Sequence, residues 1–333
     1  MRAVFHIGRP KCGTTSIQVF LQENRDRLSA QGVLYSRSDD EISSQWEFPI
    51  AALCRIKQAI PDPFVSRLLE FQDQSDQLAY SDAKLSEFDQ LLEKHAATHH
   101  TWVGSSEHAT PYLRNAEQIA ALDTILRARF DEVQYVLHVR RQEDLLASAF
   151  AEGVRRGDAI GLKEYVDLVL EKHRFNHMLL TRTWTEVIDK DQLSVRLLEP
   201  DALLDGDLCR DFASILGVDA SGFTFPDPAN PGPANRTLPY VLFLNRFIAD
   251  SGQRTPMRRR IREIGVDLVN RHFGGGPKMK LDKDTIARIR KHSAVSNEKL
   301  RKAFFPDRAE LFPERSPRNT PNNQTSHQSV ATF

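Results

Sequence analysis

A loop near the amino terminus combines residue types that bind anions. The apolar run at residues 3–7 ends in Gly8, and it is followed by a loop that reads Arg9-Pro10-Lys11-Cys12-Gly13-Thr14-Thr15-Ser16. If a strand enters this loop and a helix leaves it, the backbone N–H groups at the helix start face the loop, and the helix dipole favours an anion there. Lys11 adds a positive charge, and three hydroxyl groups add donors. The sequence therefore predicts a phosphate-binding loop.

The position of the lysine separates this loop from the Walker-type ATP-binding loop. That loop reads G-x-x-x-x-G-K-S/T, with the lysine directly after the second glycine. Gly8 and Gly13 have this spacing, but Thr14 follows Gly13 and the lysine comes earlier, at Lys11. The run from Pro10 to Thr15 instead resembles the 5′-phosphosulfate loop of sulfotransferases, whose pattern is P-K-x-G-T-T. The alternative is a strand–helix turn that carries an incidental lysine.

A second anion-binding pair follows a later strand. The apolar run at 133–139 ends in Arg140-Arg141, and Ser148 lies eight residues after Arg140. An arginine at the carboxyl end of a strand can bind a phosphate through two hydrogen bonds, and a serine about two turns into the next helix faces the same crevice. Sulfotransferases carry a similar arrangement as their 3′-phosphate site, with an acidic residue at the position of Asp144. The alternative interpretation is a solvated helix start.

The two motifs together make the chain similar to bacterial carbohydrate-active sulfotransferases. Residues 195–199, 211–219 and 296–306 also resemble later segments of that family, so the resemblance spans roughly residues 1–312 and is weakest over 40–99. It implies 3′-phosphoadenosine-5′-phosphosulfate as the donor substrate, used without a metal, and a hydroxyl acceptor on a carbohydrate or a glycolipid. The residues that would bind the donor are Arg9, Pro10, Lys11, Cys12, Gly13, Thr14, Thr15, Ser16, Arg140 and Ser148.

Three residues are candidates for the general base that would deprotonate such an acceptor. The strand predicted at 101–105 is followed by Ser106, Glu107 and His108. A carboxylate or an imidazole at a strand end beside the phosphate loop suits that role, so Glu107 is the first candidate and His108 its partner or substitute. Glu47 is the reserve, because it lies in the stretch where some sulfotransferases carry their base. A surface carboxylate beside a helix start is the alternative interpretation.

Alternating strands and helices must bring these residues together. This alternation predicts a P-loop-like doubly wound parallel α/β sheet with helices on both faces, in which ligands bind beyond the carboxyl ends of the strands. The predicted strands are 3–7, 101–105, 133–139 and 193–198, and the predicted helices of the core are 14–31, 119–130, 144–155, 162–173 and 208–216.

The chain divides into a core and a helical C-terminal part. Residues 1–225 are predicted to form the α/β core, with a helical insertion at 40–99 between its first two strands. Residues 226–313 are predicted to form a helical subdomain of the same domain, after a proline-rich loop at 227–233. The polar residues 314–333 cannot bury enough apolar surface to fold, so a disordered tail is expected there.

Composition argues against several other classes of protein. The 333 residues include 45 Lys and Arg and 45 Asp and Glu, whereas nucleic-acid-binding proteins carry a basic excess. Cys12, Cys54 and Cys209 are too few and too scattered for a disulfide framework or a zinc site. We therefore expect no nucleic-acid partner and no metal. No apolar run approaches the ~20 residues of a membrane span, and the first residues do not resemble a signal peptide, so we expect a cytoplasmic protein.

Sulfuryl transfer fits these features better than phosphoryl transfer. A P-loop kinase or another ATP-dependent phosphotransferase is the first alternative, but it would need a lysine after Gly13 and an acidic strand end that holds magnesium. A non-catalytic nucleotide-binding module is the second. In sulfuryl transfer, Lys11 would stabilise the charge that grows on the leaving phosphate. The basic run at 258–262 is either a solvated helix face or a contact for the 3′-phosphate or an anionic acceptor.

Overall fold

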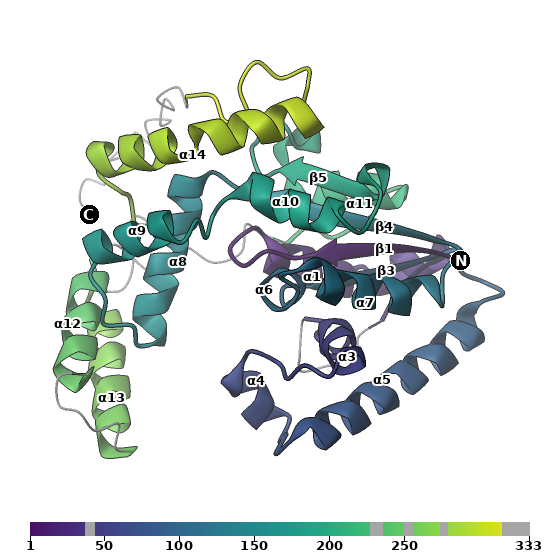
Figure 1. Ribbon diagram of the computed structural model, residues 1–333, viewed down its shortest axis with the longest axis horizontal. Coiled ribbons are helices and arrows are strands. Elements are labelled where there is room, and N and C mark those ends of the chain that lie inside the picture. The colour runs from purple at the N-terminus through teal and green to yellow at the C-terminus, as the bar shows by residue number, and fades with distance from the viewer. Residues whose placement is uncertain (37–43, 227–235, 250–255, 274–278, 315–333) are drawn as a thin grey trace, which may run out of the picture.

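A five-stranded sheet lies at the centre of the protein. The computed structural model describes residues 1–36, 44–226, 236–249, 256–273 and 279–314. All neighbouring strands are parallel, in the order β2-β3-β1-β4-β5 (Figure 1), which confirms the predicted parallel sheet. The prediction lacks β2, because a three-residue apolar run is too short to show strand periodicity. The strands are β1 (Arg2–Ile7), β2 (Val33–Tyr35), β3 (Thr101–Ser106), β4 (Glu132–Val139) and β5 (Leu193–Leu197).

The central strand β1 is aligned with both of its neighbours. Ile7 is in register with Ser106 of β3, and His6 is in register with Val136 of β4. The loops that follow β1, β3 and β4 therefore leave the same edge of the sheet. β2 and β3 lie on one side of β1, and β4 and β5 lie on the other, so this edge is also a topological switch point. Doubly wound sheets bind their ligands at such points.

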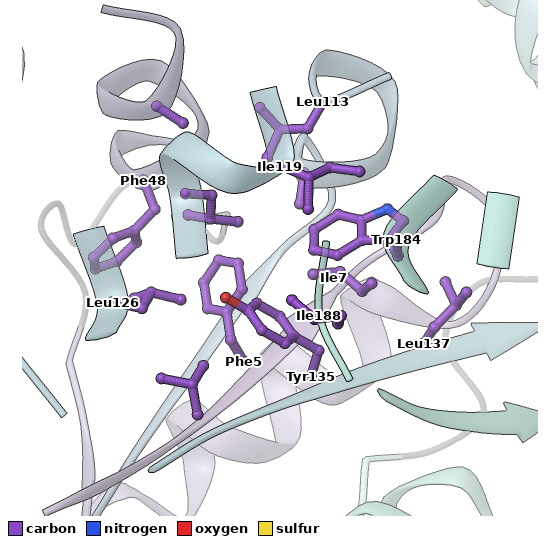
Figure 2. Packing of buried hydrophobic residues seen from close by; sticks show 14 of the residues in the cluster. Phe5, Ile7, Phe48, Leu113, Ile119, Leu126, Tyr135, Leu137, Trp184 and Ile188 are labelled. Atoms are coloured by element: carbon purple, nitrogen blue, oxygen red, sulfur yellow. The ribbon is translucent and has the colours of Figure 1, made fainter. Parts of the chain in front are cut away.

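Alternate residues of β1 enter two separate cores. Phe5 and Ile7 point into the larger core, where Tyr135 and Trp184 pack beside them (Figure 2), and Val4 points to the opposite face. Side chains that alternate between two buried faces explain why the strand is apolar throughout. Helices cover both faces, as predicted. The first is covered by α3 (Glu47–Arg55), α7 (Ala116–Arg127) and α10 (His177–Thr185), and the second by α1 (Thr14–Glu23), α2 (Arg25–Ala30) and α11 (Leu208–Leu216).

The helix predicted over 14–31 is two helices, α1 and α2, so that prediction is wrong. They meet at Asn24, whose side-chain amide donates to the carbonyls of Phe20 (2.8 Å) and Thr224 (2.7 Å). The Asn24 amide oxygen also accepts from the Thr224 N–H (2.7 Å). An asparagine that bonds the backbone in this way competes with the helix. The break depends on a segment 200 residues away, which helical periodicity does not reveal.

The helical insertion lies between the strands predicted at 3–7 and 101–105, and the additional strand β2 directly precedes it. Asp62 and Asp73 cap its helices α4 (Pro63–Leu68) and α5 (Gln74–His95) by accepting from N–H groups of the first turn. Phe48 of α3 and Phe88 of α5 both pack on Trp102 of β3, with ring centroids 5.2 and 5.0 Å away. The insertion therefore shares the larger core of the sheet. A short helix, α6 (Ala109–Tyr112), then follows β3.

The C-terminal part is helical, as predicted. α12 (Leu238–Ala249) packs against α8 (Gln142–Arg156) and α13 (Pro256–Phe273), and α14 (Lys283–Phe304) packs against α8 and α10 (Figure 1). The predicted loop at 227–233 and, apart from Glu314, the predicted tail at 314–333 lie outside the described residues, and the domain boundaries at 225 and 313 stay predictions. α9 (Leu162–Glu171) follows α8, and short 3-10 turns lie at η1 (Lys190–Gln192) and η2 (Leu204–Gly206).

Candidate active site

The loop after β1 is held against the segment that follows β3. The Gly8 N–H donates to the Ser106 carbonyl (2.8 Å), and the Thr110 hydroxyl donates to the Gly8 carbonyl (2.9 Å). A Cβ atom on Gly8 would lie 2.9 Å from Cα of Glu107 and 2.8 Å from the methyl group of Thr14. A side chain at Gly8 would therefore push the phosphate loop away from Glu107.

Two residues of the loop have left-handed backbone conformations. Gly13, with φ 85°, directly precedes α1, and Lys11 has φ 67°. For a residue with a side chain such a conformation costs on the order of 1–3 kcal/mol. Arg140 supports it, because Nη1 of Arg140 donates to the Lys11 carbonyl (3.2 Å). The functional role of Lys11 stays a prediction.

The Lys11 ammonium forms an ion pair with Glu152 of α8. The Glu152 carboxylate also accepts from Arg155 (3.3 Å) and Arg156 (2.8 Å), so three cations surround one anion. Burial raises the pKa of Glu152, but the hydrogen bond and charge of Lys11, with the two arginines, outweigh burial and bring the pKa below its ordinary value. Glu152 therefore stays ionised and neutralises part of a strongly positive site.

The face of α8 that carries Glu152 also carries Ser148. Asp144, Ser148 and Glu152 are spaced by four residues, so they share one side of the helix. Because Glu152 reaches Lys11, this side faces the phosphate loop. The structure thus brings Arg140 and α8 to the loop, and the donor-binding role of Ser148 stays a prediction. The sequence prediction missed Glu152, although its helical spacing from Ser148 was a usable signal.

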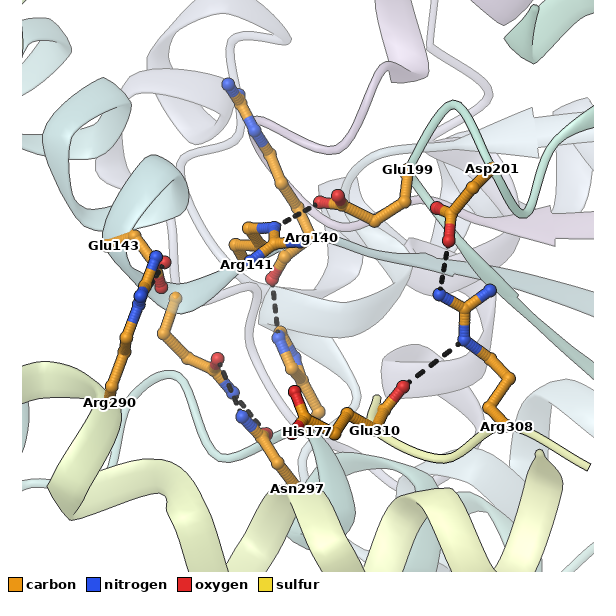
Figure 3. A network of polar contacts seen from close by, with 11 residues as sticks. Arg140, Arg141, Glu143, His177, Glu199, Asp201, Arg290, Asn297, Arg308 and Glu310 are labelled. Carbon is orange, nitrogen blue, oxygen red and sulfur yellow. Dashed lines mark hydrogen bonds and ion pairs between the residues drawn. The ribbon is translucent and has the colours of Figure 1, made fainter. Parts of the chain in front are cut away.

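The two arginines at the end of β4 have different environments. Arg141 is buried, and its Nε donates to Glu199 (2.8 Å) (Figure 3). The next residue, Gln142, exchanges two hydrogen bonds with Asn297 of α14. These contacts fix the start of α8 to the C-terminal helix. Arg140 is half-buried and turned toward the loop, so it is the arginine of the pair that is placed to meet an anion.

Arg9 is directed away from the anion site. Its buried guanidinium donates to Nδ1 of His177 (2.6 Å) and to the Arg174 carbonyl (2.8 Å). A guanidinium can only donate, so Nδ1 of His177 accepts, and its Nε2–H donates to the Arg140 carbonyl (2.7 Å) (Figure 3). Burial, together with the Arg9 charge, lowers the pKa of His177 to about 3. A neutral His177 therefore joins the phosphate loop to the end of β4, and the donor-binding role of Arg9 stays a prediction.

Other residues of the loop form hydrogen bonds within it. The Cys12 N–H (3.1 Å) and the Thr14 hydroxyl (3.3 Å) both donate to the Arg9 carbonyl. Both side chains are buried, and burial raises the pKa of the Cys12 thiol, so it stays protonated. The loop residues that keep an exposed or half-exposed surface, besides Lys11, are Pro10, Gly13, Thr15 and Ser16.

Glu107 and His108 lie directly after β3, beside the loop. The hydroxyl of Ser44, a residue of the insertion, accepts from the Glu107 N–H (3.2 Å) and lies 3.0 Å from Nδ1 of His108. Burial lowers the pKa of His108, and the charge of Arg156 lowers it further, although the carboxylates of Glu107 and Asp62 oppose both. The imidazole is thus neutral at neutral pH and can accept a proton.

Glu47 begins α3 and is buried. The N–H of Gln45 donates to the Ser105 carbonyl (3.1 Å), and the side-chain oxygen of Gln45 accepts from the Ser105 N–H. These bonds fix the start of α3 against β3. All three candidate bases therefore gather near the end of β3, and the choice of Glu107 among them stays a prediction.

Two further buried histidines, His6 and His138, lie on the α1 side of the sheet. Nδ1 of His6 lies 2.9 Å from the Ser105 hydroxyl, and Nδ1 of His138 lies 3.4 Å from Nε2 of His6. Burial lowers the pKa of both histidines, that of His138 to about 3. Both are therefore uncharged.

Other parts of the chain offer less to a ligand site. Among the described residues, His, Cys, Asp and Glu side chains form no group of three that could hold a metal ion. Within the same residues, no helix is both long enough and apolar enough to cross a membrane. In the basic run, Arg262 donates to Asn245 (2.8 Å) and to the Arg155 carbonyl, which favours a structural role. The side chains of Arg258 and Arg259 lie outside the described part.

Comparisons with known proteins give one weak likeness. No family model and no curated protein match the sequence. Among solved structures, the chain is similar to a sulfotransferase from Alicyclobacillus acidocaldarius, with 13% sequence identity over 90% of this chain and 94% of that chain and a TM-score of 0.47. Because the identity and the TM-score are both low, the functional argument rests on the residues of the site.

Proposed function

We propose that the protein transfers a sulfuryl group from 3′-phosphoadenosine-5′-phosphosulfate to a hydroxyl group on a carbohydrate or a glycolipid. The observation that supports the proposal is that Arg140 and the helix that carries Ser148 both contact the loop through Lys11. Arg140 bonds the Lys11 carbonyl, and Lys11 pairs with Glu152, one helical turn beyond Ser148. This donor has a 3′-phosphate as well as a 5′-phosphosulfate, so it needs two anion sites. ATP has no 3′-phosphate and therefore could not occupy the second anion site.

Each anionic group of the donor has its own set of proposed partners. The N–H groups at the start of α1, the hydroxyls of Thr15 and Ser16 and the Lys11 ammonium would bind the 5′-phosphosulfate. The guanidinium of Arg140 and the hydroxyl of Ser148 would bind the 3′-phosphate. Arg140 also contacts the main chain of the loop, so the two sites are held in a fixed relation.

The reaction requires one proton transfer and one displacement at sulfur. The general base, Glu107 in our assignment, takes the proton of the acceptor hydroxyl, and the oxygen attacks sulfur. The bond between sulfur and the 5′-phosphate oxygen breaks, which leaves a sulfate ester and 3′-phosphoadenosine-5′-phosphate. Negative charge grows on the departing oxygen, so a cation at that position lowers the barrier. Lys11 is the cation of the loop, and we assign it this role.

The ion pair between Lys11 and Glu152 must open before Lys11 can act on the departing oxygen. To reach the donor, the Lys11 ammonium must leave the Glu152 carboxylate, which Arg155 and Arg156 continue to neutralise. The exchange therefore leaves no unpaired carboxylate behind. Before the donor arrives, Glu152 would neutralise the charge of Lys11, and it would then compete with the donor's anionic groups for that ammonium.

Titration calorimetry with two nucleotides tests the proposal. We expect 3′-phosphoadenosine-5′-phosphate to bind far more tightly than ATP with magnesium, because only the first ligand uses both anion sites. The same protein, mixed with the sulfuryl donor and a panel of hydroxyl acceptors, should release 3′-phosphoadenosine-5′-phosphate. Equal affinity for the two nucleotides, or tighter binding of ATP, would contradict the proposal and favour a phosphotransferase.

A further inference from the structure

The helix pair α12–α13 exposes an unusual amount of apolar surface. Phe243 and Phe247 of α12 are 67% and 68% exposed, and Met257 and Ile264 of α13 are 73% and 59% exposed. The two helices pack against each other at the edge of the molecule (Figure 1). We define the hairpin face by its large exposed aromatic and aliphatic side chains, which are Phe243, Phe247, Met257, Ile261, Ile264 and Leu268.

These side chains lie on the outer side of both helices. In α12, Asn245 faces the core, because its Nδ2 donates to the Val154 carbonyl of α8 (2.7 Å). Phe243 and Phe247 stand roughly opposite Asn245 at 3.6 residues per turn. In α13, Arg262 faces α8, and Ile264 and Leu268 stand opposite it by the same spacing.

The two apolar stripes lie on helices that contact each other. A Cβ atom on Gly265 of α13 would lie 2.9 Å from a methyl group of Leu244 of α12, so this side chain packs directly on the α13 backbone. The stripes therefore flank a tight helix–helix contact. Both stripes lie on the sides of their helices that are directed away from α8.

The hairpin also has a charge of its own. Residues 238–273 contain seven arginines and three acidic residues, whereas the whole chain has a formal net charge of zero. Arg260 is exposed beside the hairpin face. A positive excess of four on an apolar hairpin would repel a second copy of the same hairpin, so charge complementarity favours an anionic partner over self-association.

We propose that the hairpin face docks on an anionic lipid bilayer. Apolar side chains on one side of a basic amphipathic helix enter the boundary between headgroups and acyl chains, and arginines meet the lipid phosphates. The proposal does not depend on the sulfotransferase assignment. α12 packs on α8, the helix that carries Ser148 and Glu152, so docking would bring that helix close to the membrane surface.

Vesicle binding of the full-length protein tests this inference. We expect co-sedimentation with vesicles of phosphatidylglycerol and phosphatidylcholine, little with phosphatidylcholine alone, and weaker binding at high salt. The double variant Phe247→Glu/Ile264→Glu should lose roughly tenfold or more of the partition coefficient. Arg260→Gln should lose about fivefold, since one arginine near an anionic surface contributes about 1 kcal/mol. The matched control is Phe64→Glu, on a side chain that is 63% exposed on α4 and should bind like the wild type.

Three outcomes would overturn the proposal. One is the absence of binding to anionic vesicles by a folded wild-type protein. Another is an equal loss in Phe64→Glu and in the hairpin variant. The third is a wild-type dimer in sedimentation velocity that Phe247→Glu dissociates, because the face would then be covered by a second copy. Thermal unfolding of each variant checks that it is folded. Binding of 3′-phosphoadenosine-5′-phosphate in the same samples tests the proposed function separately.

Discussion

The two halves of the candidate site are built in different ways. The donor half comprises the phosphate loop, Arg140 and α8, and its parts are held together through His177 and Glu152. The base half comprises Glu107, His108 and Glu47, and its parts are held by residues of the insertion, such as Ser44. The donor half thus belongs to the sheet itself. The base half depends on the helical insertion, whose sequence would have to differ in a protein that uses another acceptor.

The two halves also differ in charge. In the donor half, Lys11, Arg155 and Arg156 surround one carboxylate, and Arg140 adds a fourth cation beside the loop. The base half contains carboxylates and an imidazole that burial keeps neutral. A concentration of positive charge binds anions, and groups that are unprotonated at neutral pH accept protons. The difference supports a division of labour between donor binding and acceptor activation.

The largest expected effect falls on the base half. Glu107→Gln keeps the size of the side chain and removes its proton acceptor, so kcat should fall 10²–10⁴-fold, the usual contribution of a general base. Binding of 3′-phosphoadenosine-5′-phosphate should stay within about twofold of wild type. Steady-state kinetics and calorimetry provide both values. Glu47→Gln and His108→Gln are the matched comparisons, and a larger loss of kcat in either one would transfer the role of base to that residue.

Removing the lysine of the loop should have the next largest effect. Lys11→Ala should lower kcat by roughly 10²–10³-fold, because the charge that Lys11 meets develops in the transition state. The KM for the donor should change much less. Lys84→Ala, on the exposed α5 ion pair, serves as the control. A variant with normal kcat and a raised donor KM would show that Lys11 only binds.

Acid should lower the free energy of unfolding of the protein, because His138 and His177 are buried in their neutral forms. The pKa values of His138 and His177 are about 3 in the folded protein, against about 6.5 when unfolded, so the unfolded chain takes up protons first. Their stabilising effect is complete above pH 6.5 and is lost as the pH falls toward 3. Between pH 6.5 and 5.5 we expect a loss of about 2 kcal/mol in the free energy of unfolding. Urea unfolding, followed by fluorescence of the buried tryptophans, measures it. If the free energy of unfolding of His177→Gln depended on pH as strongly as that of the wild type, the contribution assigned to His177 would be wrong.

The smallest effect is expected at Glu152. Glu152→Gln removes a negative charge beside Lys11, so 3′-phosphoadenosine-5′-phosphate should bind up to roughly tenfold more tightly at low salt. Glu186→Gln removes a carboxylate from an exposed helical pair and should leave the affinity unchanged. Weaker binding in Glu152→Gln would mean that the carboxylate positions Lys11 for the donor and does not compete with it.

The sequence locates the loop and its flanking elements more readily than the contacts of the segment after β3, for a physical reason. The loop and the Arg140–Ser148 pair each lie within one strand–helix unit, so spacing alone places them. His177 bonds Arg9 across 168 residues, and Ser44 reaches Glu107 across 63, and neither contact leaves a local pattern. The same holds for the break at Asn24.

The central claim is that Arg140 and Ser148 form a second phosphate site next to the loop. Calorimetry of 3′-phosphoadenosine-5′-phosphate against 5′-AMP tests it most directly, because the two ligands differ only by the 3′-phosphate. The wild type should prefer the first ligand by at least about tenfold, as a charge-assisted contact contributes roughly 1.5–3 kcal/mol. Arg140→Ala should remove most of that preference and leave 5′-AMP binding unchanged, whereas Arg127→Ala, in an exposed pair on α7, should retain it. Equal binding of both ligands by the wild type, or an undiminished preference in Arg140→Ala, would contradict the claim.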